Sequence, residues 1–171
     1  MDPVEKGKAE MGSVERLFSK LPGIKGYREK ELRRAADKQV RDGLARKLEA
    51  QRRRVTSLQS DLLGAGGLLW MDDIARVVGR LQLLIDRIKT AAYGYAGFFD
   101  LERVKEAELD CLIEFDQMLF DDLPRLDEAI AGLEQAIGAG EGHKKAIQTL
   151  ADLLAEMNDT FGRRQDAMRS A

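Results

Sequence analysis

Cysteine and histidine are almost missing from this chain of 171 residues, which contains one of each. A single cysteine cannot close a disulfide within the chain, and it cannot supply a cysteine-based zinc site. A single histidine excludes every metal centre that needs two imidazoles from one chain. The composition therefore gives no reason to expect a metal, a cofactor or a small-molecule substrate.

Long hydrophobic runs are missing as well. The longest uncharged runs, 62–71 and 90–99, have ten residues each, whereas a membrane-spanning helix needs roughly 18 or more. The first twenty residues carry eight charged side chains and lack the apolar core of a signal peptide. We therefore predict a cytoplasmic protein, with attachment to a membrane surface as the alternative, and an unpaired Cys111 fits that compartment.

Apolar side chains at helical spacing dominate the chain from about residue 27 onward. No stretch alternates apolar and polar residues as a half-buried strand does. Glycine-rich stretches at 64–67, 93–97 and 138–142 interrupt the pattern, and Asp72 or Asp73 is a candidate N-cap after the first of them. The sequence predicts an all-α fold, an elongated antiparallel bundle or coiled coil of about four helices, in which short connections make consecutive helices neighbours.

The predicted helices differ in length. At about 1.5 Å per residue, a first helix over roughly 28–63 is ~54 Å long, and a second over roughly 72–93 is only ~33 Å long. A third helix should kink or break near Pro124, because proline removes a backbone donor and clashes with the preceding turn. Residues 125–138 would then form a separate short helix. The first half of helix one would therefore extend beyond its neighbours and leave apolar surface uncovered.

The formal net charge of the chain is −2, but two of its segments carry large charges of opposite sign. Residues 25–54 contain twelve basic and five acidic side chains, a balance of +7, and residues 99–141 contain three basic and thirteen acidic ones, a balance of −10. The basic helix could lie along the acidic one, so that flanking charges set the pairing. Alternatively, it could bind an external anion such as phospholipid headgroups or nucleic acid.

Residue patterns that could carry chemistry all have simpler structural explanations. The segment 138–145 is rich in glycine and lysine but lacks the spacing and the preceding strand of a phosphate loop, so we expect a turn with His143 at the start of the last helix. Glu106, Asp110 and Glu114 share one helix face, which we interpret as a solvated acidic face. Cys111 is expected to be a packed thiol.

Two turns contain clusters of large apolar side chains. Four of the chain's aromatic residues fall within 93–99, where they could seal the end of the bundle or form an exposed patch for another subunit or a membrane interface. Leu68, Leu69 and Trp70 occupy the other turn. We expect these three to pack under the start of the second helix as a hydrophobic staple.

We predict a largely flexible segment at 1–24 and a single helical domain at 25–171. The expected function is that of a non-catalytic scaffold or adaptor that binds proteins, above all other copies of itself. The contact would involve the first helix or the part of the chain after Pro124. In the first helix, apolar side chains would form the contact and arginines would steer the partner; these residues are Leu32, Val40, Leu44, Leu48, Val55, Arg33, Arg34, Arg41, Arg52, Arg53 and Arg54.

The alternative function uses the basic helix 25–54 as a peripheral binder of an anionic membrane surface or of nucleic acid. Nucleic acid has less support, because Tyr27 is the one aromatic residue in this segment and stacking on bases needs more.

Overall fold

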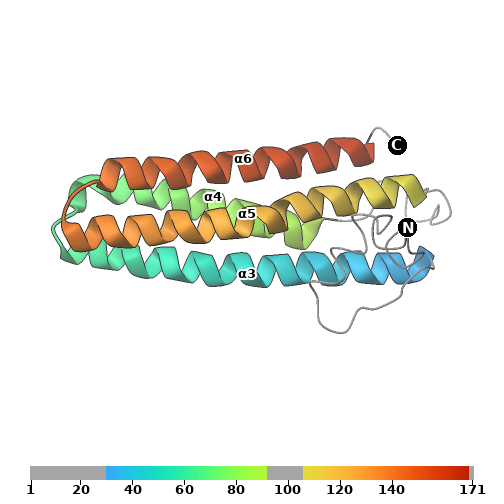
Figure 1. Ribbon diagram of the computed structural model, residues 1–171, viewed down its shortest axis with the longest axis horizontal. Helices are drawn as coiled ribbons and strands as arrows, with labels where there is room; N and C mark the ends of the chain where they lie inside the picture. Colours follow the sequence, from blue (N-terminus) through green and yellow to red (C-terminus); the bar gives the residue numbers. More distant parts are fainter. Residues whose placement is uncertain (1–29, 92–105, 170–171) are drawn as a thin grey trace, which may run out of the picture.

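A computed structural model describes residues 30–91 and 106–169 (Figure 1), with side chains over 38–91, at 112 and over 114–167. The predicted flexible segment 1–24 and the aromatic turn at 93–99 lie outside these residues. Within the described ranges the chain forms helices and no strand, so the all-α prediction is confirmed.

The described residues form four long helices, which make up an elongated rod. They are α3 (Lys30–Gly64), α4 (Met71–Thr90), α5 (Glu106–Ala139) and α6 (His143–Arg169), with a short 3-10 helix η1 (Leu68–Trp70) before α4. The predicted bounds of the first two helices agree with α3 and α4 to within a few residues.

Two antiparallel hairpins, α3–α4 and α5–α6, lie side by side, so that α3 packs on α5 and α4 packs on α6. Hydrogen bonds show that α4 and α6 run in the same direction, because Arg80 and Arg87 reach the main-chain carbonyls of Ala151 and Asn158 respectively. The expectation that every consecutive pair would be neighbours is therefore wrong for α4 and α5, which occupy opposite corners of the bundle.

The core runs along the rod axis and is built from the predicted apolar stripes. In α4 the stripe repeats at steps of three and four, as a helix facing a bundle core does, and its buried members are Ile74, Val77, Leu81, Leu84, Ile85 and Ile88. Each of the other three helices contributes a comparable stripe to the same cluster.

Helix α5 continues through Pro124, and the predicted separate helix at 125–138 does not form. Proline has no backbone N–H, so the carbonyl of Phe120 loses its partner four residues on, and Figure 1 shows α5 changing direction between its yellow and orange parts. Pro124 is exposed, whereas Phe120 and Leu126 on either side are buried. Packing on both sides of the proline holds the helix together, so the prediction of a kink holds and the prediction of a break does not.

Glycine ends both α3 and α5 with the same motif. Gly66 has a φ of 84°, its N–H bonds to the carbonyl of Leu63, and the N–H of Gly67 bonds to that of Leu62 at 2.8 Å. Gly140, with a φ of 74°, closes α5 in the same manner, and these paired bonds define a Schellman C-cap.

Trp70 occupies the N-cap position of α4 without a side-chain capping bond, and the predicted caps Asp72 and Asp73 lie in the first turn. Their charges face the positive end of the helix dipole there. The two carboxylates therefore favour the start of α4 electrostatically, without capping it.

Candidate functional site

The apolar residues predicted to bind a partner are covered by the chain itself. Val40, Leu44, Leu48 and Val55 are each 0% exposed and belong to the core. Helix α5, with 34 residues, accompanies the 35 residues of α3, so α3 has a neighbour where a broken third helix would have left none. The expectation that these side chains form uncovered surface is wrong. The side chain of Leu32 lies outside the described residues.

The predicted steering arginines are divided between several environments. Arg41 is buried and donates to the carbonyls of Ile88 and Ala91 at the end of α4. Arg54 is half-buried and bridges Asp127 at 2.7 Å and Glu134 at 3.1 Å on α5, so part of the basic helix does lie along the acidic one. Arg52 is half-buried and Arg53 exposed. The side chains of Arg33 and Arg34 lie outside the described part.

A buried ion pair that the sequence analysis missed joins α5 to α6. Arg164 Nε lies 2.8 Å from Asp116 Oδ1 and Nη2 lies 3.3 Å from Oδ2. Both side chains are 1% exposed. Two parallel hydrogen bonds from a guanidinium fork to a carboxylate form the geometry in which such a pair is strongest.

Arg87 extends this ion pair into a layer across the bundle. The guanidinium groups of Arg87 and Arg164 lie 5.2 Å and 5.6 Å from the ring centroid of Phe161, within the range of cation–π attraction. Arg87 also donates to Asn158 and Gln165 on α6. The guanidinium groups bind protein groups of their own chain, so this layer is a structural feature and offers no evident ligand site.

A signal for this layer is present in the sequence. The apolar stripe of α5 steps by three and four through Leu112, Leu119, Leu123 and Leu126, and Asp116 occupies one of its positions. In α6, the stripe leaves a gap of seven between Phe161 and Met168, and Arg164 fills it. Opposite charges at seam positions of two helices predict a buried pair if those helices are neighbours, and the sequence alone did not establish that they were.

The groups singled out for possible chemistry are separated in space. Among residues 30–91 and 106–169, no cluster of three histidine, cysteine, aspartate or glutamate side chains could hold a metal ion. His143 begins α6 as predicted, with its ring 6.3 Å from that of Trp70. Glu114 is exposed, and the side chains of Glu106, Asp110 and Cys111 lie outside the described residues.

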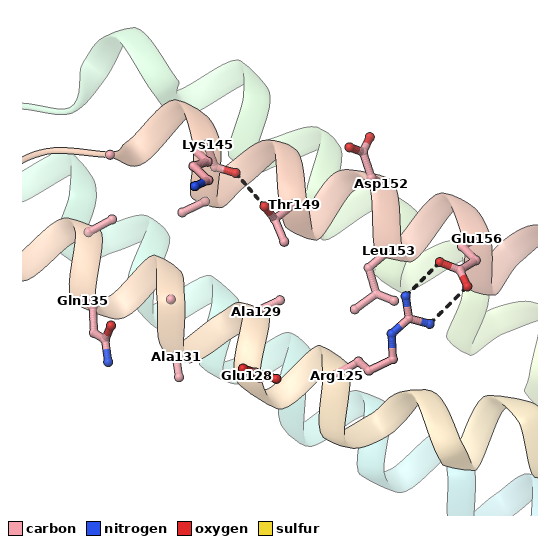
Figure 2. A pocket seen from close by; sticks show the side chains of 14 residues that line it. Arg125, Glu128, Ala129, Ala131, Gln135, Lys145, Thr149, Asp152, Leu153 and Glu156 are labelled. Atoms are coloured by element: carbon pink, nitrogen blue, oxygen red, sulfur yellow. Dashed lines mark hydrogen bonds and ion pairs between the residues drawn. The ribbon is translucent and has the colours of Figure 1, made fainter.

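A groove runs along the outer surface between α5 and α6 (Figure 2). Its floor consists mainly of small residues, which are Ala129, Gly132 and Ala136 from α5 and Ala146 from α6. Figure 2 shows Arg125 reaching from α5 across the groove to Glu156 on α6, with both hydrogen bonds at 3.0 Å. This pair closes one end of the groove.

Three carboxylates and two cations line the groove. Glu128 is exposed and bonds to no other described residue, and Asp152 accepts a hydrogen bond from Gln148. Hydrogen bonding to Arg125 lowers the pKa of Glu156 below its usual range, and the same interaction raises the pKa of Arg125. Lys145 is the other cation that lines the groove, so its lining carries more negative than positive charge.

The outer face of α3 has the opposite sign. Lys38, Arg46, Lys47 and Arg53 are exposed and form no hydrogen bond or ion pair with the rest of the described chain. Glu49 on the same helix is paired with Lys89, whose hydrogen bond lowers the pKa of that carboxyl group. Three of these cations, Lys38, Arg46 and Arg53, recur at helical spacing on one side of α3 and define its basic face. Asp42 and the paired Glu49 lie among them, and Lys47 lies on the flank.

The turn between α3 and α4 exposes leucines that were expected to be packed. Leu68 is 72% exposed and Leu69 is 80% exposed. Trp70 and Met71 do pack against the core. The predicted staple is therefore wrong for the two leucines, because the glycine turn places them at the end of the rod, beyond the reach of the core.

No helix in the described ranges is long and apolar enough to cross a membrane. The chain matches no known family model, no curated protein and no solved structure at a significant level.

Proposed function

We propose that this protein is a non-catalytic helical scaffold that assembles with copies of itself. In this proposal the basic face of α3 on one copy docks into the α5–α6 groove of the next copy. The observation that carries the proposal is the pair of complementary surfaces on one rod, a basic helix face and a groove with an acidic rim.

The floor of the groove suits a docked helix. Ala129, Gly132 and Ala136 are spaced three and four residues apart, so they share one face of α5. A Cβ atom added at Gly132 would meet nothing within 4 Å. Small side chains in such a row let another helix approach closely and insert its own side chains between the two walls.

The charges favour α3 as the docked helix. Arg46 and Arg53 are seven residues apart and lie on one side of α3, separated by about two turns, or ~10.5 Å. Glu128 and Asp152 lie on opposite walls of the groove, so a basic helix between them has an acidic group on each side. Such complementarity speeds association and sets orientation more than it adds affinity.

The proposed contact joins two different surfaces, so it is heterologous. Each copy carries both surfaces, and one docking event leaves a free groove and a free basic face. Heterologous contacts build closed rings or open filaments, according to the rotation between copies. Either outcome is an assembly with a repeated surface, which is what a scaffold provides.

Charge reversal on each surface in turn tests the proposal. We expect the wild-type chain to show a mass above that of the monomer by light scattering at tens of micromolar and low salt, and to dissociate as salt screens the contact. The variant Arg46→Glu/Arg53→Glu should be monomeric because two acidic surfaces would meet. The variant Glu128→Lys/Asp152→Lys should be monomeric because two basic surfaces would meet.

Mixing the two variants provides the decisive observation, because each restores the charge that the other lacks. We expect the mixture to associate although neither variant does alone. As a control, Lys144→Glu/Arg163→Glu makes the same change in net charge at exposed positions of α6 outside the groove lining and should still associate. A wild-type chain that stays monomeric throughout contradicts the proposal, as does a mixture that fails to associate.

A steric test uses two matched glycines. Gly132 on the groove floor and Gly79 on the outer face of α4 are both exposed, inside helices and without neighbours within 4 Å of an added Cβ atom. Gly132→Leu should weaken association by filling the groove, whereas Gly79→Leu should not. Equal effects of the two substitutions would argue against docking in the groove.

The basic face of α3 also supports a second candidate function, the binding of an anionic membrane surface or nucleic acid. The same exposed cations favour it. We expect salt-dependent retention on heparin and flotation with anionic liposomes if this function holds. Loss of both in Arg46→Glu/Arg53→Glu, together with a monomeric wild-type chain, would favour this candidate over self-association.

A further inference from the structure

Three exposed leucines lie at the end of the rod where α3 turns into α4. Leu63, Leu68 and Leu69 are 52%, 72% and 80% exposed, and we name these three residues the tip. Leu68 and Leu69 are the most exposed large hydrophobic residues of the described chain. Exposed apolar side chains concentrated at one end of a molecule indicate a site of contact with something other than water.

The backbone of the turn holds the tip in place. Gly67 packs so closely on the end of α3 that a Cβ atom there would lie 2.7 Å from the carbonyl oxygen of Leu62. The N–H of Trp70 bonds to the carbonyl of Gly67 at 3.0 Å and begins η1. The exposure of Leu68 and Leu69 is therefore a consequence of an ordered, hydrogen-bonded turn.

The area of the tip is too small for a stable contact between the tips of two copies. The transfer free energy of one leucine side chain corresponds to roughly 60–120 Å² of buried apolar surface. Three leucines on each of two copies therefore bury at most roughly 720 Å². Stable protein interfaces bury about 1,200 Å² or more, so a tip-to-tip dimer of this chain falls short.

We propose that the tip inserts end-on into the interfacial layer of a lipid bilayer. A bilayer sets no minimum area, because each apolar side chain that enters it contributes independently. A site at the end of the rod can enter the layer while the charged sides of the bundle stay in water. Trp70 directly follows the leucines, and tryptophan favours the level of the headgroups.

Charged residues at this end of the rod indicate which lipid is needed. The contact between Trp70 and His143 brings the start of α6 next to the tip, and Lys144 there is exposed. Exposed Asp61, Asp72 and Glu141 offset that positive charge. The tip should therefore enter neutral membranes through apolar contact, in contrast to the charge-dependent binding considered for the basic face of α3.

This inference does not depend on self-association. A single tip with three leucines binds weakly, and an assembly that presents several tips to one membrane would bind much more tightly through its higher effective concentration.

Trp70 is the one tryptophan of the chain, which makes it a specific fluorescent probe next to the tip. We would titrate the full chain with neutral phosphatidylcholine vesicles, with and without bromine on the acyl chains. The emission of Trp70 should shift to the blue, and the brominated lipid should quench it. Leu68→Ser/Leu69→Ser should lower the partition coefficient by roughly tenfold or more.

Leu83→Ser is the matched control, because Leu83 is 52% exposed but lies on α4, along the side of the rod. It should leave partitioning unchanged. Absence of quenching at millimolar lipid overturns the proposal, as does equal loss in the control. The chain could instead bind only anionic vesicles, and Arg46→Glu/Arg53→Glu could abolish that binding. This result would overturn the proposal and assign the lipid contact to α3. Loss of self-association in Leu68→Ser/Leu69→Ser without lipid identifies the tip as a protein contact instead.

Discussion

The two halves of the rod have cores of different chemistry. The half next to the glycine turns, which we call the turn half, spans 55–81 and 126–154, and every fully buried side chain in it is aliphatic. The other half, which we call the charged half, contains all the polar side chains that are buried among the described residues. They are Arg41, Asp116, Thr160 and Arg164.

This difference shows how the same bundle is held together by two means. In the turn half, short turns join α3 to α4 and α5 to α6. Each turn already places its two helices side by side, so aliphatic packing is sufficient to hold them together there. The charged half lies away from these turns. There, Arg164 on α6 pairs with Asp116 on α5, and Arg41 on α3 donates to a carbonyl at the end of α4. Buried ion pairs add less stability than apolar packing. We expect these two contacts to penalise wrong neighbours, because a wrong neighbour would leave a buried charge without its partner.

The largest effect should come from removing one partner of the buried pair. Asp116→Ala leaves the guanidinium of Arg164 buried without its carboxylate, which should reduce the free energy of unfolding by about 3–5 kcal/mol. Urea denaturation followed by circular dichroism measures this. The double variant Asp116→Leu/Arg164→Leu removes both charges and should be as stable as the wild type, or more so. A loss below 1 kcal/mol in Asp116→Ala would show that the two halves do not differ as described.

Arg41 provides the next test of the charged half. Arg41→Met keeps much of the apolar stem but removes the donors to the carbonyls of Ile88 and Ala91, which should cost about 1.5–3 kcal/mol. Amide hydrogen exchange should increase in the last turn of α4 and remain unchanged near Ile74 at its other end. Uniform acceleration along α4 would mean that Arg41 does not act locally.

The turn half has its own sensitive position at Gly67. Gly67→Ala forces a Cβ atom against Leu62 and should reduce the free energy of unfolding by about 1–3 kcal/mol. Gly64→Ala, three residues earlier, meets nothing within 4 Å and should be tolerated. Thermal denaturation of the two variants side by side measures the difference, and equal melting temperatures would contradict the close approach at Gly67.

The smallest effect concerns the exposed pair between Arg125 and Glu156. In Arg125→Gln the pKa of Glu156, which the arginine holds below its usual range, should return toward the ordinary value. Because the folded state lowers this pKa, the pair stabilises the fold at pH values above the ordinary pKa of a glutamate. This contribution is lost as the pH falls through the lowered pKa. NMR titration of the carboxyl group measures the shift, which salt should reduce.

Glu49 is the internal control for that titration. Its pKa is lowered by Lys89, and this pair joins α3 to α4, whereas Arg125 and Glu156 join α5 to α6. The pKa of Glu49 should therefore not change in Arg125→Gln. A parallel change at Glu49 would indicate a general loss of structure.

Much of the fold could be predicted because helical periodicity is a local property. The stripe of α4, the glycine breaks and the unequal lengths of α3 and α4 all follow from residues close together in the sequence. Pro124 shows the limit of this reasoning, since the local rule predicts a kink or a break. The packing of Phe120 and Leu126 on either side keeps α5 continuous, and that packing depends on other helices.

The candidate surfaces were harder to predict, because exposure depends on which helices become neighbours. The sequence by itself determined that the chain is helical, which stripes are apolar and where opposite charges concentrate. Only the tertiary structure decided that α5 covers the apolar stripe of α3, that Asp116 meets Arg164, and that Leu68 and Leu69 remain in solvent. An apolar stripe indicates that one face of a helix must be buried. Which helix covers that face depends on contacts between residues far apart in the chain.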